Sequence, residues 1–347
     1  MISAKKEVIE YMLKLTVTPG SNDNASNTFP TIAEAISYVP KDNTEPVVIE
    51  VAPGIYPEKI TLDRPYIHLI GSSADECIIT YGDYARDLMP DGSKRGTFRS
   101  YTFLLDADHV TLENLTIRNS AFPRSKAGQA VALYADGDHL LIKSCRLESY
   151  QDTLFTGPLP PAPMQIGGFT GPKEFADRRV GRQYYKDCYI CGDVDFIFGS
   201  AIAYFENCEI ASVFSEELPQ TPDGSTPVYG YATAASTPED SAYGYVFDRC
   251  RFTSTCPKES VYLGRPWRNY AQTVLLNCYL GEHIRPEGFH DWNKPEARQT
   301  CFYAEYNSTG PGADNGQGKR ADFVHILSDE EALRYAKDKV LGDFLVQ

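Results

Sequence analysis

The sequence lacks any uninterrupted apolar run long enough to span a membrane. Its first residues, MISAKKEVIEYMLKL, have charges scattered through them, so they also lack the apolar core of a signal peptide. We therefore expect a cytoplasmic protein that makes no contact with a membrane. A secreted protein whose export signal has been trimmed would show the same pattern and is the alternative.

Positive charge and histidine are both scarce. The chain holds 33 basic and 47 acidic residues, giving a net charge of −14 at pH 7, and so acidic a surface repels nucleic acid and anionic membranes. The six histidines are scattered, without the spacing of metal ligands. We expect no nucleic-acid partner, no metal site and no cofactor.

Nine cysteines are an odd number, and in a large chain without a signal peptide they do not require a disulfide framework. Five of them share a pattern in which an apolar residue stands two positions after the cysteine. These are Cys145, Cys188, Cys208, Cys250 and Cys278. Because free cysteine behaves as a small hydrophobic residue, we predict that all five lie in the core.

The same five cysteines mark a repeat. The intervals between them are 43, 20, 42 and 28 residues. Each of the two longest contains a Pro/Gly/Ser-rich segment, 157–181 or 215–244, which we interpret as an insertion into a coil of about 22 residues. Short strand-like runs such as HLLIK and TVLLN lie between the cysteines. The pattern predicts an all-β fold, a single-stranded right-handed parallel β-helix, in one domain over residues 1–347, with long loops that wall a cleft.

Few segments of the chain favour helix. Thr31 precedes Glu34 by three residues, and Ser328 precedes Glu331 in the same way, which is the pattern of a capping box. The coils at the two ends of a solenoid expose their apolar faces. We therefore expect a short helix to cover each end.

Four polar residues fall at matching positions of the predicted coils. Gln129 and Gln151 are 22 residues apart, and Asp152 and Asp195 are 43 apart, which is 20 once an insertion of 23 is set aside. We expect the four to gather on one outer sheet face. Solvated polar side chains, or a glutamine ladder between coils, would explain them as well. Amides that bind an oxyanion and paired carboxylates instead favour acyl-transfer chemistry.

Five motifs, in this order, resemble the pectin methylesterase family: GIYPEKI, GQAVALY, QDTLF, DFIFG and LGRPW. The resemblance covers residues 29–310 approximately, and leaves 311–347 as a C-terminal tail with a helix. The family's fold is a right-handed parallel β-helix. The resemblance thus agrees with the fold expected from the repeat.

The resemblance also implies roles for the polar residues. Asp195 would be the nucleophile and Asp152 the general acid and base. Gln129 and Gln151 would form the oxyanion hole, and Arg265 would pair with Asp195 to keep it ionised and oriented.

Four aromatic residues would line the sugar-binding cleft, since aromatic faces suit the apolar faces of sugar rings. These are Trp267, Phe198, Phe155 and Tyr134. The segment 157–181 directly follows QDTLF, and we expect it to affect substrate length and access.

Other residues of the motifs are expected to have no catalytic role. Asp193, two residues before Asp195, is predicted to be a solvated or capping carboxylate. Tyr56 and Glu58, in GIYPEKI, are interpreted as structural.

The function implied is hydrolysis of the methyl ester on C6 of galacturonate, with release of methanol. The partner would be methyl-esterified homogalacturonan or its oligomers, bound by a monomer. Two alternatives are a β-helix lyase or hydrolase that cuts the glycosidic chain and a non-catalytic pectin-binding β-helix. A lyase typically requires Ca²⁺ carboxylates, which this glutamine-rich pattern does not supply.

Overall fold

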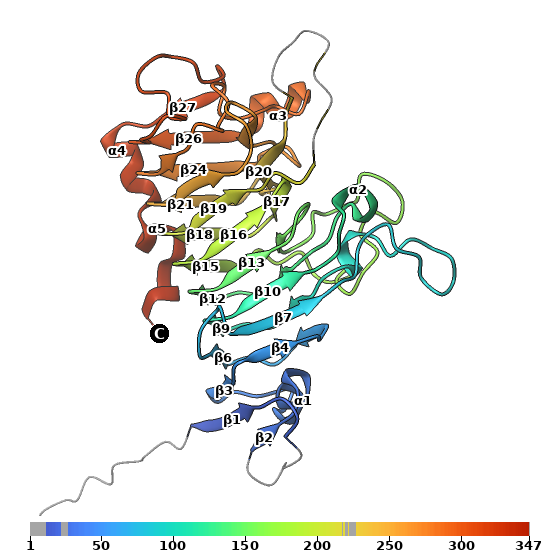
Figure 1. Cartoon of the computed structure of the whole chain (residues 1–347). Helices are drawn as coiled ribbons and strands as arrows, with labels where there is room; N and C mark the ends of the chain where they lie inside the picture. The colour runs from blue at the N-terminus through green and yellow to red at the C-terminus, as the bar shows by residue number, and fades with distance from the viewer. Residues whose placement is uncertain (1–11, 22–26, 217, 219–220, 222–226, 347) are drawn as a thin grey trace, which may run out of the picture.

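Three parallel sheets run side by side along the molecule, with twelve, eight and seven strands. The computed structural model describes residues 12–21, 27–216, 218, 221 and 227–346, so most of the charged N-terminal segment lies outside the described residues. From β3 to β26, consecutive strands of the chain enter different sheets, and each pairs in parallel with the strands of the neighbouring coils (Figure 1). Crossovers between parallel strands are right-handed. The fold is the right-handed parallel β-helix that the repeat predicted.

The strands of each sheet follow in spatial order. The twelve-stranded sheet contains β2 (Thr28–Phe29), β1 (Leu13–Val17), β3 (Val47–Val51), β6 (Ile67–Gly71), β9 (Val110–Glu113), β12 (Leu140–Lys143), β15 (Arg182–Lys186), β18 (Ile202–Glu206), β21 (Tyr245–Asp248), β24 (Gln272–Leu276), β26 (Phe302–Tyr306) and β27 (Val324–Ile326). The eight-stranded sheet contains β25 (Tyr279–Leu280), β22 (Arg251–Ser254), β19 (Glu209–Ser212), β16 (Tyr189–Gly192), β13 (Arg146–Glu148), β10 (Thr116–Asn119), β7 (Cys77–Tyr81) and β4 (Gly54–Tyr56). The seven-stranded sheet contains β23 (Val261–Gly264), β20 (Gly230–Ala235), β17 (Val194–Gly199), β14 (Leu154–Thr156), β11 (Leu133–Ala135), β8 (Phe103–Leu105) and β5 (Ile60–Leu62).

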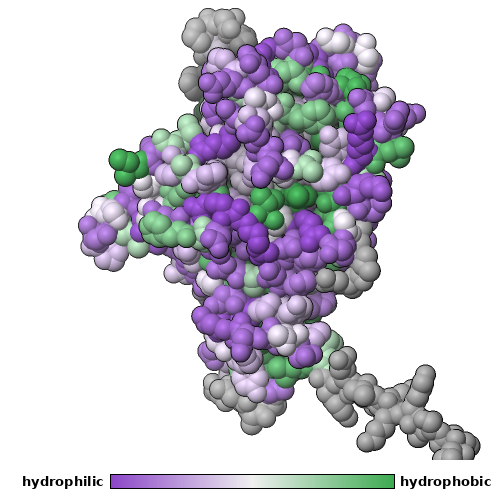
Figure 2. Space-filling view, turned by 180° about the vertical axis from the view of Figure 1, so that it is seen from behind, coloured by the Kyte–Doolittle hydropathy of each residue, from purple (hydrophilic) through white to green (hydrophobic). Residues whose placement is uncertain are grey.

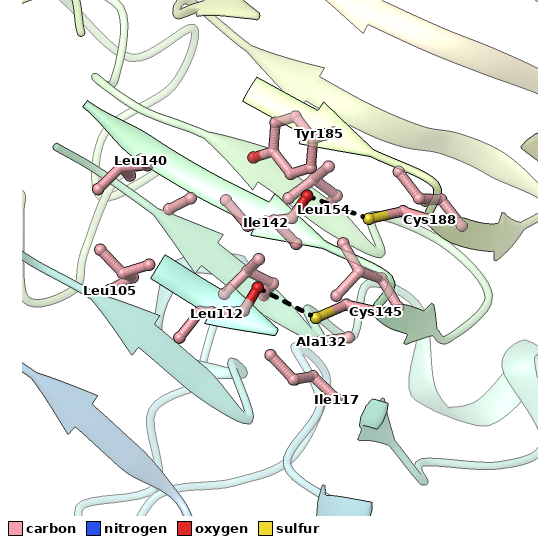
Figure 3. Close-up of a cluster of buried hydrophobic side chains, with 14 of the residues drawn as sticks. Leu105, Leu112, Ile117, Ala132, Leu140, Ile142, Cys145, Leu154, Tyr185 and Cys188 are labelled. Carbon is pink, nitrogen blue, oxygen red and sulfur yellow. Dashed lines mark hydrogen bonds between the residues drawn. The ribbon is translucent and has the colours of Figure 1, made fainter. Parts of the chain in front are cut away.

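One hydrophobic core fills the space between the sheets, with members from Leu15 to Tyr303. The five repeated cysteines all belong to it, and all nine cysteines are free thiols. The thiol of Cys145 donates to the carbonyl of Leu112 at 3.5 Å, and that of Cys188 to Ile142 at 3.3 Å (Figure 3). The predicted core position of the repeated cysteines is confirmed.

The segment 215–244 is only partly an insertion, contrary to expectation. It contains β20, which pairs with β17 and β23 and so completes a coil. Apart from Tyr231, the run GYATAA contains only small residues. A Cβ on Gly230 would come within 2.1 Å of the carbonyl oxygen of Asp193. The segment 157–181, in contrast, contains no strand and is an insertion between β14 and β15.

The N-terminal end of the solenoid is covered by α1 (Ile32–Tyr38), as predicted. Thr31 caps this helix by accepting from the N–H of Glu34. The carboxylate of Glu58 accepts from the N–H groups of Ile32 and Ala33, at 3.1 and 3.0 Å. Glu58 therefore has a structural role, since it satisfies two backbone donors that a helix N-terminus leaves free.

The C-terminal helices do not cover the opposite end, and that prediction was wrong. The capping box of Ser328 and Glu331 is present, but the segment forms short turns that pack along the outer face of the twelve-stranded sheet (Figure 1). Apolar side chains on that face, such as Tyr204 and Val274, bury Val340 and Leu341. The remaining short elements are α2 (Arg124–Ala127), α3 (Pro295–Thr300), α4 (Asp329–Ala332), α5 (Lys337–Leu341), and the 3₁₀ turns at Thr97–Arg99, Leu333–Tyr335 and Gly342–Val346.

The face of the molecule in Figure 2 is mostly hydrophilic, with some hydrophobic residues near the middle and others scattered toward its edges. In the described part of the chain, no helix has both the length and the apolar character needed to cross a bilayer.

Candidate active site

Gln129 and Gln151 lie side by side, just before strands β11 and β14 of the seven-stranded sheet. Their backbones form a parallel bridge, as the 22-residue spacing predicted. Both side chains are partly exposed. Among the described residues, neither amide side chain has a hydrogen-bond partner. Both amides can therefore donate to a ligand on the outer face of the sheet.

Asp152 and Asp195 occupy the next positions along the same face. The N–H of Asp152 donates to the carbonyl of Val194 at 3.1 Å, and β14 pairs with β17, with Leu154 opposite Ile197. The pairing of β17 with β20 is irregular between Val194 and Ile197. An irregularity of this kind turns a side chain out of the regular alternation. Asp195 therefore does not follow the regular alternation of side chains along β17.

Both acids have a left-handed backbone, with φ of 66° at Asp152 and 52° at Asp195. This conformation is uncommon for residues other than glycine. Several asparagines at turns between coils, such as Asn114 and Asn207, share it, so it does not by itself identify a functional residue. The surrounding coils hold the two residues in this conformation, and both residues are 8 % exposed.

Arg265, which follows β23, forms a bidentate ion pair with Asp195. Its Nε lies 2.8 Å from Oδ1 and its Nη2 lies 2.7 Å from Oδ2. Burial raises the pKa of Asp195, and the two charge-assisted hydrogen bonds from Arg265 oppose that rise. The fork geometry fixes the orientation of the carboxylate as well as its charge.

Two aromatic rings enclose the guanidinium of Arg265, and the sequence argument missed both. Its central carbon lies 3.8 Å from the ring centroid of Tyr231 and 3.6 Å from that of Trp292. The rings restrict Arg265 to the orientation that meets Asp195. The chain has only two tryptophans, and this scarcity could have drawn attention to Trp292.

The carboxyl of Asp152 has no hydrogen bond or ion pair with any described residue. Burial and the neighbouring charge of Asp195 raise the pKa of Asp152 well above its ordinary value. The rise is greater than at Asp195, where Arg265 opposes it. As the pH increases, Asp195 therefore ionises first, and Asp152 keeps its proton beside an ionised neighbour.

Asp193 is neither solvated nor a capping residue, which corrects the sequence prediction. Its side chain is 1 % exposed and forms an ion pair with Nε of Arg124, in α2, at 2.7 Å. The hydroxyl of Ser215 and the N–H of Val194 donate to the same carboxylate. A buried carboxylate requires such partners. The cation comes from a segment 69 residues away in the chain, which local sequence could not reveal.

Most of the predicted sugar-binding aromatics lie beneath the surface, which argues against a broad contact between their rings and a sugar. Tyr134 and Phe155 are fully buried, and Phe198 is 4 % exposed. The three pack with Phe98 and with Phe169 from the 157–181 insertion, because aromatic rings bury large apolar areas. Trp267 rests on this aromatic cluster and is partly exposed, so it is the one of the four that can meet a sugar ring.

A cavity of about 1110 Å³ is lined by Trp267 and by Leu159, which belongs to the aromatic cluster. Its walls come from the start of the 157–181 insertion, from the loops after β20 and β23, and from residues 293–296. The insertion therefore walls a cleft beside the candidate site. Within the described ranges, no three Asp, Glu, His or Cys side chains gather as a metal site.

Comparison with known families and structures agrees with this geometry. A family model described as Pectinesterase matches residues 20–158 and 176–343. Pectinesterase QRT1 of Arabidopsis thaliana is 32% identical over 323 residues, which cover 90% of this chain and 74% of that protein. Probable pectinesterase/pectinesterase inhibitor 23 of the same plant is also 32% identical, and this chain spans only 50% of its length.

Solved structures show the same likeness. A mutant pectin methylesterase in complex with a hexasaccharide superposes with a TM-score of 0.77 at 32% identity, covering 95% of this chain and 97% of that one. Pectin methylesterase PemA from Erwinia chrysanthemi gives a TM-score of 0.74 at 33% identity, with the same coverage.

Proposed function

Because the chain belongs to the pectinesterase family, we propose that it hydrolyses methyl esters on C6 of galacturonate in pectin or pectic oligosaccharides. One observation carries the proposal: a buried, oriented carboxylate, Asp195, lies beside a buried acid, Asp152, whose carboxyl has no partner among the described residues. The amides of Gln129 and Gln151, which have no partner in the described part of the chain, complete the arrangement. The products are methanol and the free acid.

In the first half of the reaction, a carboxylate oxygen of Asp195 attacks the ester carbonyl carbon. The amides of Gln129 and Gln151 donate hydrogen bonds to the oxygen that becomes negative. Asp152 gives its proton to the methoxy oxygen, the carbon–oxygen bond breaks, and methanol leaves. An anhydride between Asp195 and the C6 carbonyl remains.

In the second half, the ionised Asp152 takes a proton from water, and the resulting hydroxide attacks the C6 carbonyl. The anhydride bond breaks, which restores the carboxylate of Asp195 and releases the C6 acid. Asp152 is protonated again, so the cycle consumes one water for each ester. All residues used come from one chain, so a monomer suffices. The monomeric state and the cytoplasmic location stay predictions.

The proposal is tested by methanol release from methylated pectin, with and without chelator, together with the length of the products. We expect methanol, unchanged chain length and no effect of chelator. Shortened chains would favour a lyase or glycosidase, and binding without any product would favour a non-catalytic solenoid.

An activated aryl ester of galacturonate distinguishes the roles of the two acids, because its leaving group needs no proton. Asp152→Asn should release one equivalent of phenol in a burst and then stall, because deacylation lacks its base. Asp195→Asn should show no burst. A burst in Asp195→Asn alone would reverse the two roles.

A further inference from the structure

A buried ion pair joins two segments that lead into the candidate site. Asp193 stands two residues before Asp195, and Arg124 stands five residues before Gln129. Nε of Arg124 lies 2.7 Å from Oδ2 of Asp193, whose side chain is 1 % exposed. The pair therefore fastens the chain that enters Gln129 to the chain that enters Asp195.

The helix α2 leads directly from Arg124 to Gln129. The N–H of Gly128 donates to the carbonyl of Arg124 at 2.8 Å and ends the helix. Gly128 has a φ of 67°, in the left-handed region, and a Cβ there would lie 3.0 Å from Nε of Arg86. Gln129 follows, and its carbonyl accepts from the N–H of Ala85 at 2.8 Å. A displacement of Arg124 would therefore reach Gln129 through a single helical turn.

The carboxylate of Asp193 also fixes the turn before Asp195. Its Oδ1 accepts from the N–H of Val194 at 2.6 Å. The carbonyl of Val194 accepts from the N–H of Asp152 at 3.1 Å. The carbonyl of Asp193 accepts at 3.0 Å from the N–H of Tyr231, whose ring contacts the guanidinium that pairs with Asp195. The orientation of these two peptides thus affects both acids of the site.

The backbone of Asp193 reaches the second glutamine as well. Its N–H donates at 3.0 Å to the carbonyl of Tyr150, the residue directly before Gln151. Residues 193 and 194 therefore have backbone hydrogen bonds next to Gln151, to Asp152 and to the ring that supports the arginine of the site. Only the contact with α2 connects them to the segment of Gln129 by a charge.

Further partners hold each charge of the pair in place. The hydroxyl of Ser215 donates to Oδ2 of Asp193 at 2.7 Å, and Nη1 of Arg124 pairs with Glu216 at 2.9 Å. A buried ion pair adds little net stability compared with well-packed apolar residues, because the loss of hydration offsets the attraction. It does require its partners at defined positions, so it fixes where α2 lies relative to Asp193.

The pair can act on the site only indirectly. Asp193 is almost fully buried, and its carboxylate already contacts three donors. Arg124 uses Nε and Nη1 for its two carboxylate partners. Neither residue lines the cavity beside Trp267. An effect of the pair on the reaction is therefore an effect on the positions of the residues that react.

We propose that Asp193 and Arg124 are positioning residues for ester hydrolysis. Their ion pair keeps the amide of Gln129 at a fixed separation from the carboxylate of Asp195. The oxyanion forms on the carbon that Asp195 attacks, so the donor and the nucleophile must keep this separation in the transition state. The inference rests on the proposed function and adds two residues to the site.

The test is the kinetics of methanol release by Arg124→Met, at a temperature where circular dichroism shows the variant to be folded. We expect kcat and kcat/KM to fall together, at least about tenfold, because a misplacement of about 1 Å can cost more than that. KM should hardly change, since neither residue of the pair contacts substrate. Unchanged kcat, with an active wild type, would overturn the inference and leave the proposed function standing.

The matched control is Leu69→Ala, which lowers stability without touching the pair. Leu69, in β6, is fully buried in the core, and its truncation leaves a cavity there. Its kcat should equal that of the wild type. An equal loss of kcat in Leu69→Ala and Arg124→Met would attribute the effect to instability and contradict the inference.

A second variant, Asp193→Asn, tests the pair without leaving a buried charge. Its kcat should also fall, and the Arg124→Met/Asp193→Asn double variant should lose no more kcat than Arg124→Met alone, because the two residues act as one pair. Losses that add in the double variant would show two independent effects and refute the positioning pair.

Hydrogen exchange tests the geometry even if the wild type released no methanol, the result that would refute the proposed function. The peptides to follow contain the N–H groups of Asp152 and Tyr231, which donate to the carbonyls of residues 194 and 193. Exchange in these peptides should be at least about tenfold faster in Arg124→Met than in Leu69→Ala. Equal exchange in the two variants would refute the inference independently of activity.

Discussion

Replacing Arg124 with methionine should destabilise the protein strongly, although Arg124 lies in a short surface turn. Arg124 is the cation paired with Asp193, at 2.7 Å, and the Asp193 side chain is 1 % exposed. Removing one partner of a buried ion pair costs about 3–5 kcal/mol, because the other charge stays buried without compensation. Ser215 and Val194 still donate to Asp193. We therefore expect a loss of about 3 kcal/mol at neutral pH, near the lower end of that range.

The loss should depend on pH in a defined direction. Burial already raises the pKa of Asp193 in the folded protein, and Arg124 opposes this rise. Without Arg124 the folded-state pKa rises further above the unfolded value. A carboxyl group with a raised folded pKa destabilises the fold above that pKa, and the penalty shrinks as the pH falls through it. The variant should therefore lose less stability at pH 5 than at pH 7.5.

These free-energy differences are measured by urea unfolding, at both pH values, of the wild type, Arg124→Met, Asp193→Asn and the double variant. Asp193→Asn removes the buried charge and leaves Arg124 paired with Glu216, at 2.9 Å. The double variant should accordingly be more stable than Arg124→Met alone. The reasoning would be refuted if Arg124→Met lost the same free energy at both pH values and gained nothing from Asp193→Asn.

Two further substitutions test the site itself. Arg265→Lys should fold normally, but kcat should fall on the order of a hundredfold, because lysine keeps the charge without the bidentate geometry that aims Asp195; near-normal kcat would exclude the positioning role. Tyr134→Phe should leave methanol release unchanged and raise the free energy of unfolding by about 1 kcal/mol, because the buried hydroxyl has no hydrogen-bond partner among the described residues. A drop in kcat/KM for Tyr134→Phe would instead support a contact between Tyr134 and the sugar, although the burial of Tyr134 argues against one.

Much of the site could be predicted because the repeat determines which residues, distant in the chain, occupy equivalent positions in successive coils. In a parallel β-helix, residues one coil apart become neighbours. The 22-residue interval between Gln129 and Gln151 therefore placed them together, and removing one insertion placed Asp152 beside Asp195. The recurring cysteines had a local signal of the same kind, since their position in the coil determined that they face the core.

The other features of the site depend on packing between segments that are not related by the coil repeat. The chain next to Asp193 predicts an exposed acid, and only the docking of α2 brings Arg124 to it. Tyr134 and Phe155 occupy outward positions that would meet a substrate, but Phe98 packs against both rings, and Phe169 of the insertion packs on Phe98. Sequence spacing determines which residues share a face, whereas the path of each loop determines which of them still reach solvent. Loop paths depend on long-range contacts, and these exist only once the coils have stacked.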